Sequence, residues 1–434
     1  MNNRKISVFV FAFTLLFLLP GYSGAQASLR RKLKNIPGVV AVEELPAKEP
    51  IKAKYLLWFE QPIDHTNPSA GKFRQRIFLM HNSFDLPMVV TTEGYAASYA
   101  ERPDFEDELL ALFNTSQMVI EHRYFGKSVP DKGWEYLTAE QAAADHHQII
   151  QAFRKRYTGK WISTGISKGG TTCLIHRVLY PNDVDITIPY VAPLNFGVED
   201  GRHESHIATT GSPASREGIR RLQSQVLMRR DKMIPMLENY VKKNELTYKI
   251  SLDELLDYMV LEYAFSFYQW GWDPSTIPAN DASDEEVFLH LVRVSSPDYF
   301  AIESWKDFLP FFVQAAKQLG YYGYDMNPYL ELMKITTTRG YLQKIFLPDS
   351  LQFTFDVSLS NRIQQYLFDE DPKMIFIYGD WDPWFASAVL FDQREKKNMM
   401  KVIAPSENHT IRISGLMKSQ REEVINRVSQ WLSE

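Results

Sequence analysis

The chain has 434 residues, 45% of them hydrophobic and 23% charged, and its formal net charge is −5. This composition excludes a disordered or fibrous protein and predicts a folded one with a large apolar core. Two of the 48 basic residues lie in the first 27, so a chain cleaved there would carry a net charge of −7. That balance argues against nucleic acid or an anionic membrane as a partner.

The first 27 residues are predicted to form a cleaved signal peptide. Arg4 and Lys5 precede the apolar run "ISVFVFAFTLLFLL", and the small residues of "GYSGAQA" suit cleavage after Ala25 or Ala27. The run is shorter than the roughly 20 residues of a membrane span, so no stable membrane anchor is expected. An uncleaved anchor is the alternative. The protein is therefore expected to be exported, to the periplasm or outside the cell.

Residues 28–200 alternate between strand and helix patterns. The short runs "YLLWFEQPID", "FRQRIFLMH", "LPMVVTTEG", "SQMVIEHRY", "GKWISTGIS" and "VDITIPYVAP" are typical of strands. Helices are predicted at "TAEQAAADHHQIIQAFRKRY", with Thr138 as N-cap and Gln141 completing a capping box, and at "GGTTCLIHRVLYP". This alternation predicts an α/β fold with a largely parallel sheet covered on both faces.

Residues 201–349 lose the strand pattern and carry apolar residues at helical spacing instead. The segments concerned are "SREGIRRLQSQVLMRRDKMIPMLENYVKKN", "SLDELLDYMVLEYAFSFYQWG", "SWKDFLPFFVQAAKQLG" and "NPYLELMKITTTRGYLQKIF". Strand signals resume in residues 350–434 with "PKMIFIYGDWDPW" and "MMKVIAPSENH", before a last helix at "SQREEVINRVSQWLSE". The simplest interpretation is an α/β catalytic domain, residues 28–200 and 350–434, with an inserted helical cap.

A nucleophilic serine is indicated by "STGISKGGTT", in which Ser167 lies between Gly165 and Gly169 in the pattern G-x-S-x-G. That spacing exposes a serine on a sharp turn between a strand and a helix. A serine hydroxyl needs an imidazole to take its proton, and the imidazole needs a carboxylate to orient it. Cys173, the only cysteine, follows the motif and is expected to be a small buried residue rather than a nucleophile.

The partners of Ser167 are predicted from strand ends farther along the chain. In this fold type the order is serine, acid, histidine. Asp382 follows the strand "KMIFIY", and His409 follows "MMKVIAP", so both lie at the edge where open α/β sheets bind their ligands. Asp380 competes for the acid role, but Asp382 lies farther past the strand and is followed by Pro383, which stiffens its turn.

Five motifs in fixed order carry a family resemblance over nearly the whole mature chain: "EQPIDHTNP", "EHRYFGKS", "YLTAEQAAAD", "GISKGG" and "DPW". The chain resembles the serine exopeptidases related to lysosomal Pro-Xaa carboxypeptidase and dipeptidyl peptidase II, and is most similar to their secreted bacterial tripeptidyl aminopeptidase branch. The resemblance implies an α/β-hydrolase with a helical cap, with Ser167 as nucleophile, Asp382 as acid and His409 as base. The lysosomal enzymes carry several disulfides and this chain can form none internally, which favours the bacterial branch.

The oxyanion formed by serine attack needs two backbone N–H donors. One is expected from Lys168, the residue after the nucleophile, and the second from Gly94 or Tyr95, after the strand "LPMVVTTEG". Gly94 could instead merely form a turn.

The substrates are expected to be peptides, because a cap over the serine restricts entry to short peptides or peptide ends. An enzyme that removes a fixed number of residues from the amino end needs a carboxylate to hold the substrate ammonium. Glu93 and Glu262 are the candidates. The resemblance implies a preference for proline on the acyl side. Phe265, Phe267, Tyr268 and Trp270 could form a flat wall for its ring.

The predicted function is thus a secreted serine exopeptidase that releases short peptides, tripeptides or dipeptides, through an acyl-enzyme. A secreted esterase or lipase would use the same triad, and a binding protein could occupy an inactive hydrolase scaffold. No cofactor is indicated, since H-E-x-x-H, paired cysteines and a phosphate-binding loop are all missing from the sequence. The adjacent histidines of "DHH", residues 145–147, would point to different faces of a helix and make a weak metal site.

Overall fold

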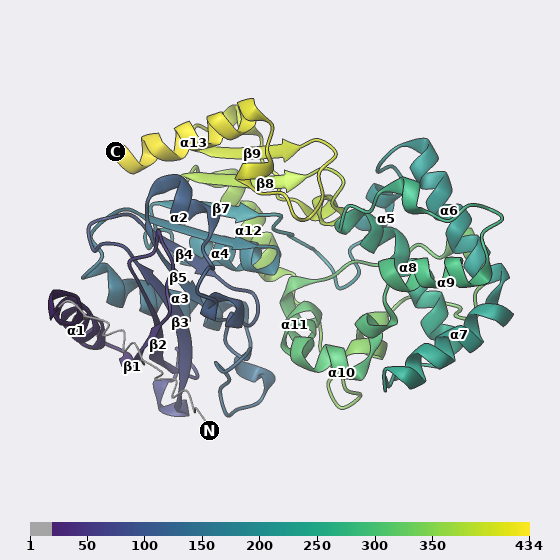
Figure 1. Cartoon of the computed structure of the whole chain (residues 1–434), viewed down its shortest axis with the longest axis horizontal. Helices are drawn as coiled ribbons and strands as arrows, with labels where there is room; N and C mark the ends of the chain where they lie inside the picture. The colour runs from purple at the N-terminus through teal and green to yellow at the C-terminus, as the bar shows by residue number, and fades with distance from the viewer. Residues whose placement is uncertain (1–19) are drawn as a thin grey trace, which may run out of the picture.

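A computed structural model describes residues 20–434 of the chain. A nine-stranded sheet occupies one half of the molecule, and a body of helices lies beside it (Figure 1). The strands follow the order β1-β2-β3-β5-β4-β6-β7-β8-β9. The first four in this order pair antiparallel, and the pairs from β5 to β9 are all parallel. A largely parallel sheet of this order, flanked by helices, is the α/β-hydrolase fold that the sequence predicts.

The strands form where β-branched and aromatic residues dominate, and those at the centre of the sheet are buried along both faces. Their bounds are β1 Val39–Leu45, β2 Ala53–Pro62, β3 Lys72–His81, β4 Met88–Thr92, β5 Ser116–Ile120, β6 Trp161–Ile166, β7 Ile186–Tyr190, β8 Met374–Gly379 and β9 Met399–Ala404. β1, at the edge, was not predicted, because its sequence "VVAVEEL" carries acidic residues that face solvent.

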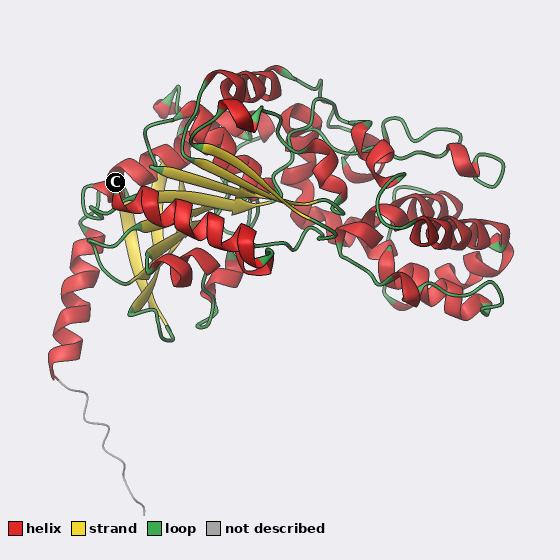
Figure 2. Cartoon of the chain, turned by 90° about the horizontal axis from the view of Figure 1, so that it is seen from above, coloured by secondary structure: helices red, strands yellow, loops and turns green. Residues whose placement is uncertain are grey.

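Helices cover both faces of the sheet (Figure 2). On one face α3 (Ala139–Arg154), α4 (Lys168–Leu179) and α12 (Ser358–Asp369) pack through apolar side chains, together with α1 (Pro20–Lys34). On the other face lie α2 (Glu108–Phe113) and α13 (Lys418–Ser433). Successive side chains of β8 point to opposite faces of the sheet: Phe376 packs on the α4 side, and Ile375 and Ile377 pack on the α13 side.

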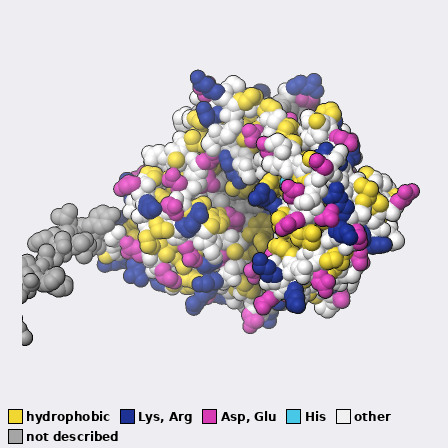
Figure 3. Space-filling model, turned by 45° about the vertical axis from the view of Figure 1, so that its right-hand side comes forward, with side chains coloured by type: hydrophobic (Ala, Val, Ile, Leu, Met, Phe, Trp, Pro, Cys, Tyr) yellow, Lys and Arg dark blue, Asp and Glu magenta, His cyan; other side chains and the backbone are white. Residues whose placement is uncertain are grey.

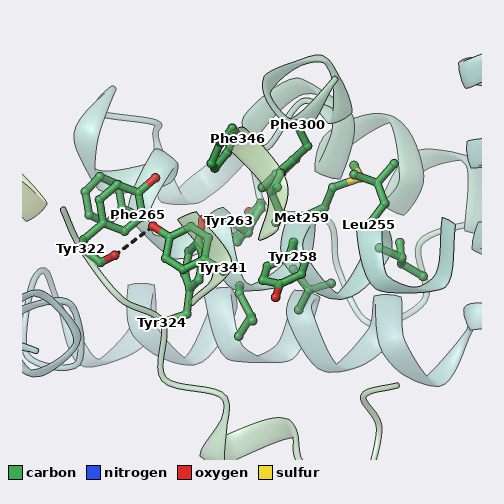
Figure 4. Packing of buried hydrophobic residues seen from close by; sticks show 14 of the residues in the cluster. Leu255, Tyr258, Met259, Tyr263, Phe265, Phe300, Tyr322, Tyr324, Tyr341 and Phe346 are labelled. Atoms are coloured by element: carbon green, nitrogen blue, oxygen red, sulfur yellow. Dashed lines mark hydrogen bonds between the residues drawn. The ribbon is translucent and has the colours of Figure 1, made fainter. Parts of the chain in front are cut away.

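The helical body between β7 and β8 has its own apolar core, rich in aromatic rings. Its helices are α5 Arg202–Ile207, α6 Pro213–Met228, α7 Arg230–Lys243, α8 Leu252–Gln269, α9 Asp284–Val294, α10 Ile302–Trp305 and α11 Leu309–Gln314. Figure 4 shows part of this core, where the rings of Phe265 and Tyr322 lie face to face, 3.7 Å apart. This body lies in the segment for which the sequence predicts a helical cap, and its helices α5 and α8 touch the turn Pro383–Ser387 next to the sheet.

Two local expectations were wrong. Helix is not formed through residues 327–346, where only the short turn Asn327–Tyr329 and the π-helical segment Leu342–Phe346 are regular. Pro328, three consecutive threonines and Gly340 oppose an α-helix there. Thr138 does cap α3, accepting a hydrogen bond from the Gln141 N–H at 3.2 Å. The Gln141 side chain, however, bonds Asp64 and the His65 N–H instead of closing a capping box.

The predicted signal peptide lies mainly in residues 1–19, outside the described residues. The two expected cleavage positions fall within α1. None of the helices in residues 20–434 combines the length and apolar character that crossing a membrane requires.

Candidate active site

Ser167 lies on a sharp turn between β6 and α4. Its backbone has φ 57° and ψ −123°, a conformation that L-residues rarely adopt. The turn is tight because Gly165 packs on Gly169: a Cβ at residue 165 would come within 2.2 Å of the Gly169 carbonyl oxygen. The Ser167 N–H donates to the Tyr190 carbonyl oxygen at 2.9 Å, which fixes the turn to the end of β7. This is the strained strand-turn-helix geometry that exposes a nucleophile.

Asp382 and His409 lie together at the same edge of the sheet, after β8 and β9. The imidazole Nδ1 of His409 is 2.6 Å from Oδ2 of Asp382. Asp382 is completely buried and His409 is 6% exposed. The other carboxylate oxygen of Asp382 accepts the Trp384 N–H at 3.1 Å. A buried carboxylate on Nδ1 leaves Nε2 as the ring nitrogen available to a nucleophile.

Asp380, the alternative acid, has a different partner. Its Oδ1 accepts the Ser406 N–H at 2.6 Å and so holds the loop that leads to His409. Of the two carboxylates, the structure therefore brings only Asp382 to the imidazole.

The loop after β4 packs directly on the turn that carries Ser167. A Cβ at Gly94 would lie 2.7 Å from Cβ and Cγ of Lys168, so only glycine allows this approach. The N–H groups of Lys168 and Tyr95 donate to no acceptor within residues 20–434. Lys168 and Tyr95 line one pocket with Ser167.

That pocket has mostly apolar walls. Its lining residues are Tyr95, Ser167, Lys168, Thr171, Pro193, Asn195, Phe311, Leu319, Gly320 and Trp384. Phe311 and Leu319 come from the cap, whereas Trp384 belongs to the "DPW" motif and Ser167, Lys168 and Thr171 belong to "STGISKGGTT". The molecule is visibly hollowed on one face, with hydrophobic side chains in the hollow and charged side chains around it (Figure 3).

The aromatic residues expected to form a wall are dispersed. Phe265 lies one layer behind the pocket, edge-on to Trp384 with ring centroids 5.5 Å apart. Phe267 and Tyr268 are buried in the cap core. Trp270 is 55% exposed, and its ring lies 6.3 Å from that of His409. The adjacent Gln269 accepts the His409 N–H at 3.2 Å, so the end of α8 rests on the histidine loop.

The two carboxylates proposed to bind an ammonium group have protein partners. Glu262 is buried and accepts hydrogen bonds from the hydroxyls of Ser266, Tyr322 and Tyr324 at 2.6, 2.9 and 2.7 Å. Burial raises its pKa. Glu93 accepts from the Tyr99 hydroxyl, and burial raises the pKa of Glu93 to about 7. Neither carboxylate lines the Ser167 pocket.

A third carboxylate, which the sequence gave no reason to select, opens into a cavity of the cap. Glu204, in α5, lines this cavity with Asp325, Tyr324 and Phe265. Its Oε2 is buried and has no hydrogen-bond partner within residues 20–434. Burial and the neighbouring Asp200 and Asp325 raise its pKa. A cation bound in this cavity would satisfy that oxygen.

The remaining polar candidates are buried or bonded to other parts of the protein, and neither ring nitrogen of His146 has a hydrogen-bond partner within residues 20–434. Cys173 is buried, its thiol donates to the Gly170 carbonyl oxygen, and burial raises its pKa. In the "DHH" segment, Asp145 pairs with Arg123, His146 is buried, and His147 bonds Asp183. The three side chains thus diverge, as expected on a helix.

The chain is similar in sequence to known peptidases. The PS-10 peptidase S37 family matches residues 24–433. The prolyl tri/tetrapeptidyl aminopeptidase of Streptomyces mobaraensis is 31% identical over 415 residues, which cover 94% of this chain and 85% of that protein. The lysosomal Pro-X carboxypeptidase of Mus musculus is 27% identical over 191 residues, 39% of each chain. A solved proline iminopeptidase of Mycobacterium smegmatis aligns with 91% of this chain and 98% of its own, at 11% identity and a TM-score of 0.38.

Proposed function

Because this chain belongs to the PS-10 peptidase S37 family and is a serine peptidase, we propose that it is an exported exopeptidase that releases tripeptides from the amino end of peptides, cutting after proline. The observation that carries the proposal is the 2.6 Å contact between His409 and Asp382 at the sheet edge that presents Ser167. The similarity to a prolyl tri/tetrapeptidyl aminopeptidase supports the residue count and the proline preference.

Catalysis proceeds by acyl transfer. Nε2 of His409 takes the hydroxyl proton while Ser167 Oγ adds to the carbonyl carbon of the scissile bond. Asp382 holds the Nδ1 proton and stabilises the imidazolium. The N–H groups of Lys168 and Tyr95 stabilise the oxyanion. His409 then protonates the leaving amine as the C–N bond breaks, and water hydrolyses the acyl-enzyme by the same route.

The pocket beside Ser167 accepts the proline. Tyr95, Phe311, Leu319 and Trp384 give it apolar walls, and a pyrrolidine ring has no polar hydrogen that would need a partner there. Trp270 lies on the His409 side. Since His409 protonates the leaving amine, Trp270 contacts the first residue of the leaving peptide.

The substrate ammonium is held by a carboxylate, and Glu204 is the one that the geometry favours. Glu204 lines a cavity and its Oε2 has no hydrogen-bond partner within residues 20–434, whereas Glu262 and Glu93 already have hydroxyl donors. Phe265 lines that cavity and packs on Trp384 of the Ser167 pocket. The Glu204 cavity and the Ser167 pocket are thus connected through one pair of packed rings, and a tripeptide, which spans roughly 10 Å when extended, is the substrate length that we expect to reach from one to the other.

Acetylating the substrate amine is expected to lower kcat/KM by about a hundredfold to several thousandfold, because it leaves a buried carboxylate without its partner. The substrate is a tripeptide anilide ending in proline, measured with and without the acetyl group. Glu204→Gln should discriminate much less between the two, whereas Glu262→Gln and Glu93→Gln should retain the preference.

Loss of discrimination in Glu262→Gln or Glu93→Gln instead would move the anchor to that residue. Equal cleavage of both anilides by the unmodified enzyme would show that no anchor exists. Faster hydrolysis of a short acyl ester than of the free-amine anilide would favour an esterase.

Export is proposed from the amino-terminal sequence alone. Arg4 and Lys5, the apolar run and the small residues around Ala25 and Ala27 support cleavage by a signal peptidase. The mature protein would then begin at Gln26 or Ser28.

A further inference from the structure

The side chain of Lys168 lies fully inside the protein, directly beneath the proposed oxyanion site. Lys168 is 3% exposed, and its Nζ donates to the Gly94 carbonyl oxygen. The rings of Tyr95 and Phe125 flank the Nζ atom, with their centroids at 5.3 and 5.0 Å. No carboxylate within residues 20–434 makes a direct ion pair with it. The nearby Glu93 favours its charged form, but burial outweighs this and holds the pKa of Lys168 well below the usual range.

Burying a lysine side chain in this way lowers the stability of the folded protein. Removing an ammonium group from water without an ionic partner destabilises the fold, and a plain apolar side chain would fill the same space at no such cost. What the lysine supplies that an apolar side chain cannot is one hydrogen bond, to the carbonyl of Gly94.

That carbonyl belongs to the peptide unit whose N–H is Tyr95. In a planar trans peptide the C=O and the following N–H point in opposite directions. Fixing the Gly94 oxygen toward Lys168 therefore fixes the direction of the Tyr95 N–H on the opposite side. Tyr95 lines the pocket of Ser167, and its N–H has no acceptor among the described residues.

We propose that the Lys168 side chain is a positioning residue of the oxyanion hole: by holding the Gly94 carbonyl it orients the Tyr95 N–H toward the substrate oxyanion. The same residue supplies the other donor from its own backbone. One residue thus sets both donors relative to Ser167. This inference rests on the acyl transfer at Ser167 proposed above.

Other hydrogen bonds restrain the loop without involving that peptide unit. Thr92 Oγ1 donates to the carbonyl oxygens of Thr164 and Gly169 at 3.3 and 3.2 Å, which ties the end of β4 to the Ser167 turn. The carbonyl of Tyr95 accepts the His122 N–H at 3.2 Å. Neither bond involves the Gly94–Tyr95 peptide unit, so the bond from Lys168 is the one that sets its orientation.

The test is Lys168→Met, which keeps the length and apolar stem but removes the donor. We expect kcat to fall about 10- to 100-fold and KM to change by no more than about threefold. Removing an oxyanion-hole donor outright lowers kcat by about 10²- to 10³-fold, and here the donor is only misdirected. The inhibition constant of a tripeptide aldehyde ending in prolinal should rise by the same factor as kcat falls, because its hemiacetal oxygen occupies the oxyanion hole. Affinity for the tripeptide product should stay within about threefold.

Lys54→Met is the matched control. Lys54 is also completely buried, its Nζ donates to the Arg102 carbonyl oxygen at 2.5 Å, and it lies 5.8 Å from the Phe105 ring. It belongs to β2, four places from β6 in the sheet. This variant removes the same type of hydrogen bond, so thermal melting of both variants measures the structural effect, and only Lys168→Met should change kcat and the aldehyde affinity.

An unchanged kcat in Lys168→Met, or a lower kcat with unchanged aldehyde affinity, would overturn the proposal. If Lys168→Met does not fold, Lys168→Gln takes its place, because the glutamine amide is too short to reach Gly94. The same losses are expected of Lys168→Gln, and the same two results would overturn the proposal. Failure of the unmodified enzyme to cleave the anilide would instead reject the proposed function.

Discussion

Replacing Ser167 with alanine is expected to lower kcat by about 10⁵- to 10⁶-fold, and His409→Ala by a similar factor. In the proposed mechanism the serine forms the acyl bond, and its hydroxyl is a poor nucleophile unless the imidazole takes its proton, so the two residues act as one unit. Hydrolysis of a free-amine tripeptide anilide, with burst-phase measurement of the released amine, gives both values. A fluorophosphonate should label the unmodified enzyme at Ser167 and should not label Ser167→Ala.

Two residues provide matched controls for these substitutions. Ser163 lies in β6, four residues before Ser167, and donates to Thr187 Oγ1 at 2.9 Å. His206 lies in α5, and its ring packs on Phe385. Phe385 follows Asp382 by one turn of the chain. Ser163→Ala and His206→Ala should each retain kcat within about tenfold. Turnover that survives in Ser167→Ala, or that is lost in His206→Ala as in His409→Ala, would contradict this assignment of nucleophile and base.

Replacing Asp382 with asparagine is expected to lower kcat on the order of 10⁴-fold, with the fold intact. The carboxylate bonds Nδ1 of His409 at 2.6 Å from a fully buried position. An amide there can donate to Nδ1, which favours the wrong tautomer and offers no charge to the imidazolium. The measurement is kcat over pH 5–9, together with thermal melting to show that the variant is folded.

Asp380→Asn is the control for the acid, because the two carboxylates are two residues apart on the same turn. Asp380 bonds the Ser406 N–H and not the imidazole. Its substitution should lower kcat less than tenfold and act mainly through the loop before His409. A larger loss in Asp380→Asn than in Asp382→Asn would transfer the acid role to Asp380.

The sheet could be predicted because its strands are marked locally. Runs such as "KMIFIYG" and "GKWISTGIS" are buried on both faces and bounded by residues that end strands. The placement of Ser167, Asp382 and His409 follows from the same signals, since each residue lies on the turn or loop that follows a strand and parallel strands end at one edge. The edge strand β1 lacked such a pattern because one side of it faces solvent.

The pocket walls and the ammonium anchor depend on contacts between distant segments. Glu262 was a reasonable candidate from its place in the cap, but two of its three hydroxyl donors are Tyr322 and Tyr324, about 60 residues away. Phe311 and Leu319 reach the Ser167 pocket only through the packing of the cap. The bond from Lys168 to Gly94 joins residues 74 positions apart, and no local pattern indicates it.

Mass spectrometry of the products from a defined library of free-amine peptides tests the central claim most directly. The library varies the position of proline from the second to the fifth residue, and each peptide is also supplied in acetylated form. We expect release of intact tripeptides from peptides with proline at the third residue, little cleavage of their acetylated forms, and no products from the Ser167→Ala protein. Cleavage at internal positions irrespective of the free amine, or release of residues from the carboxyl end, would contradict it.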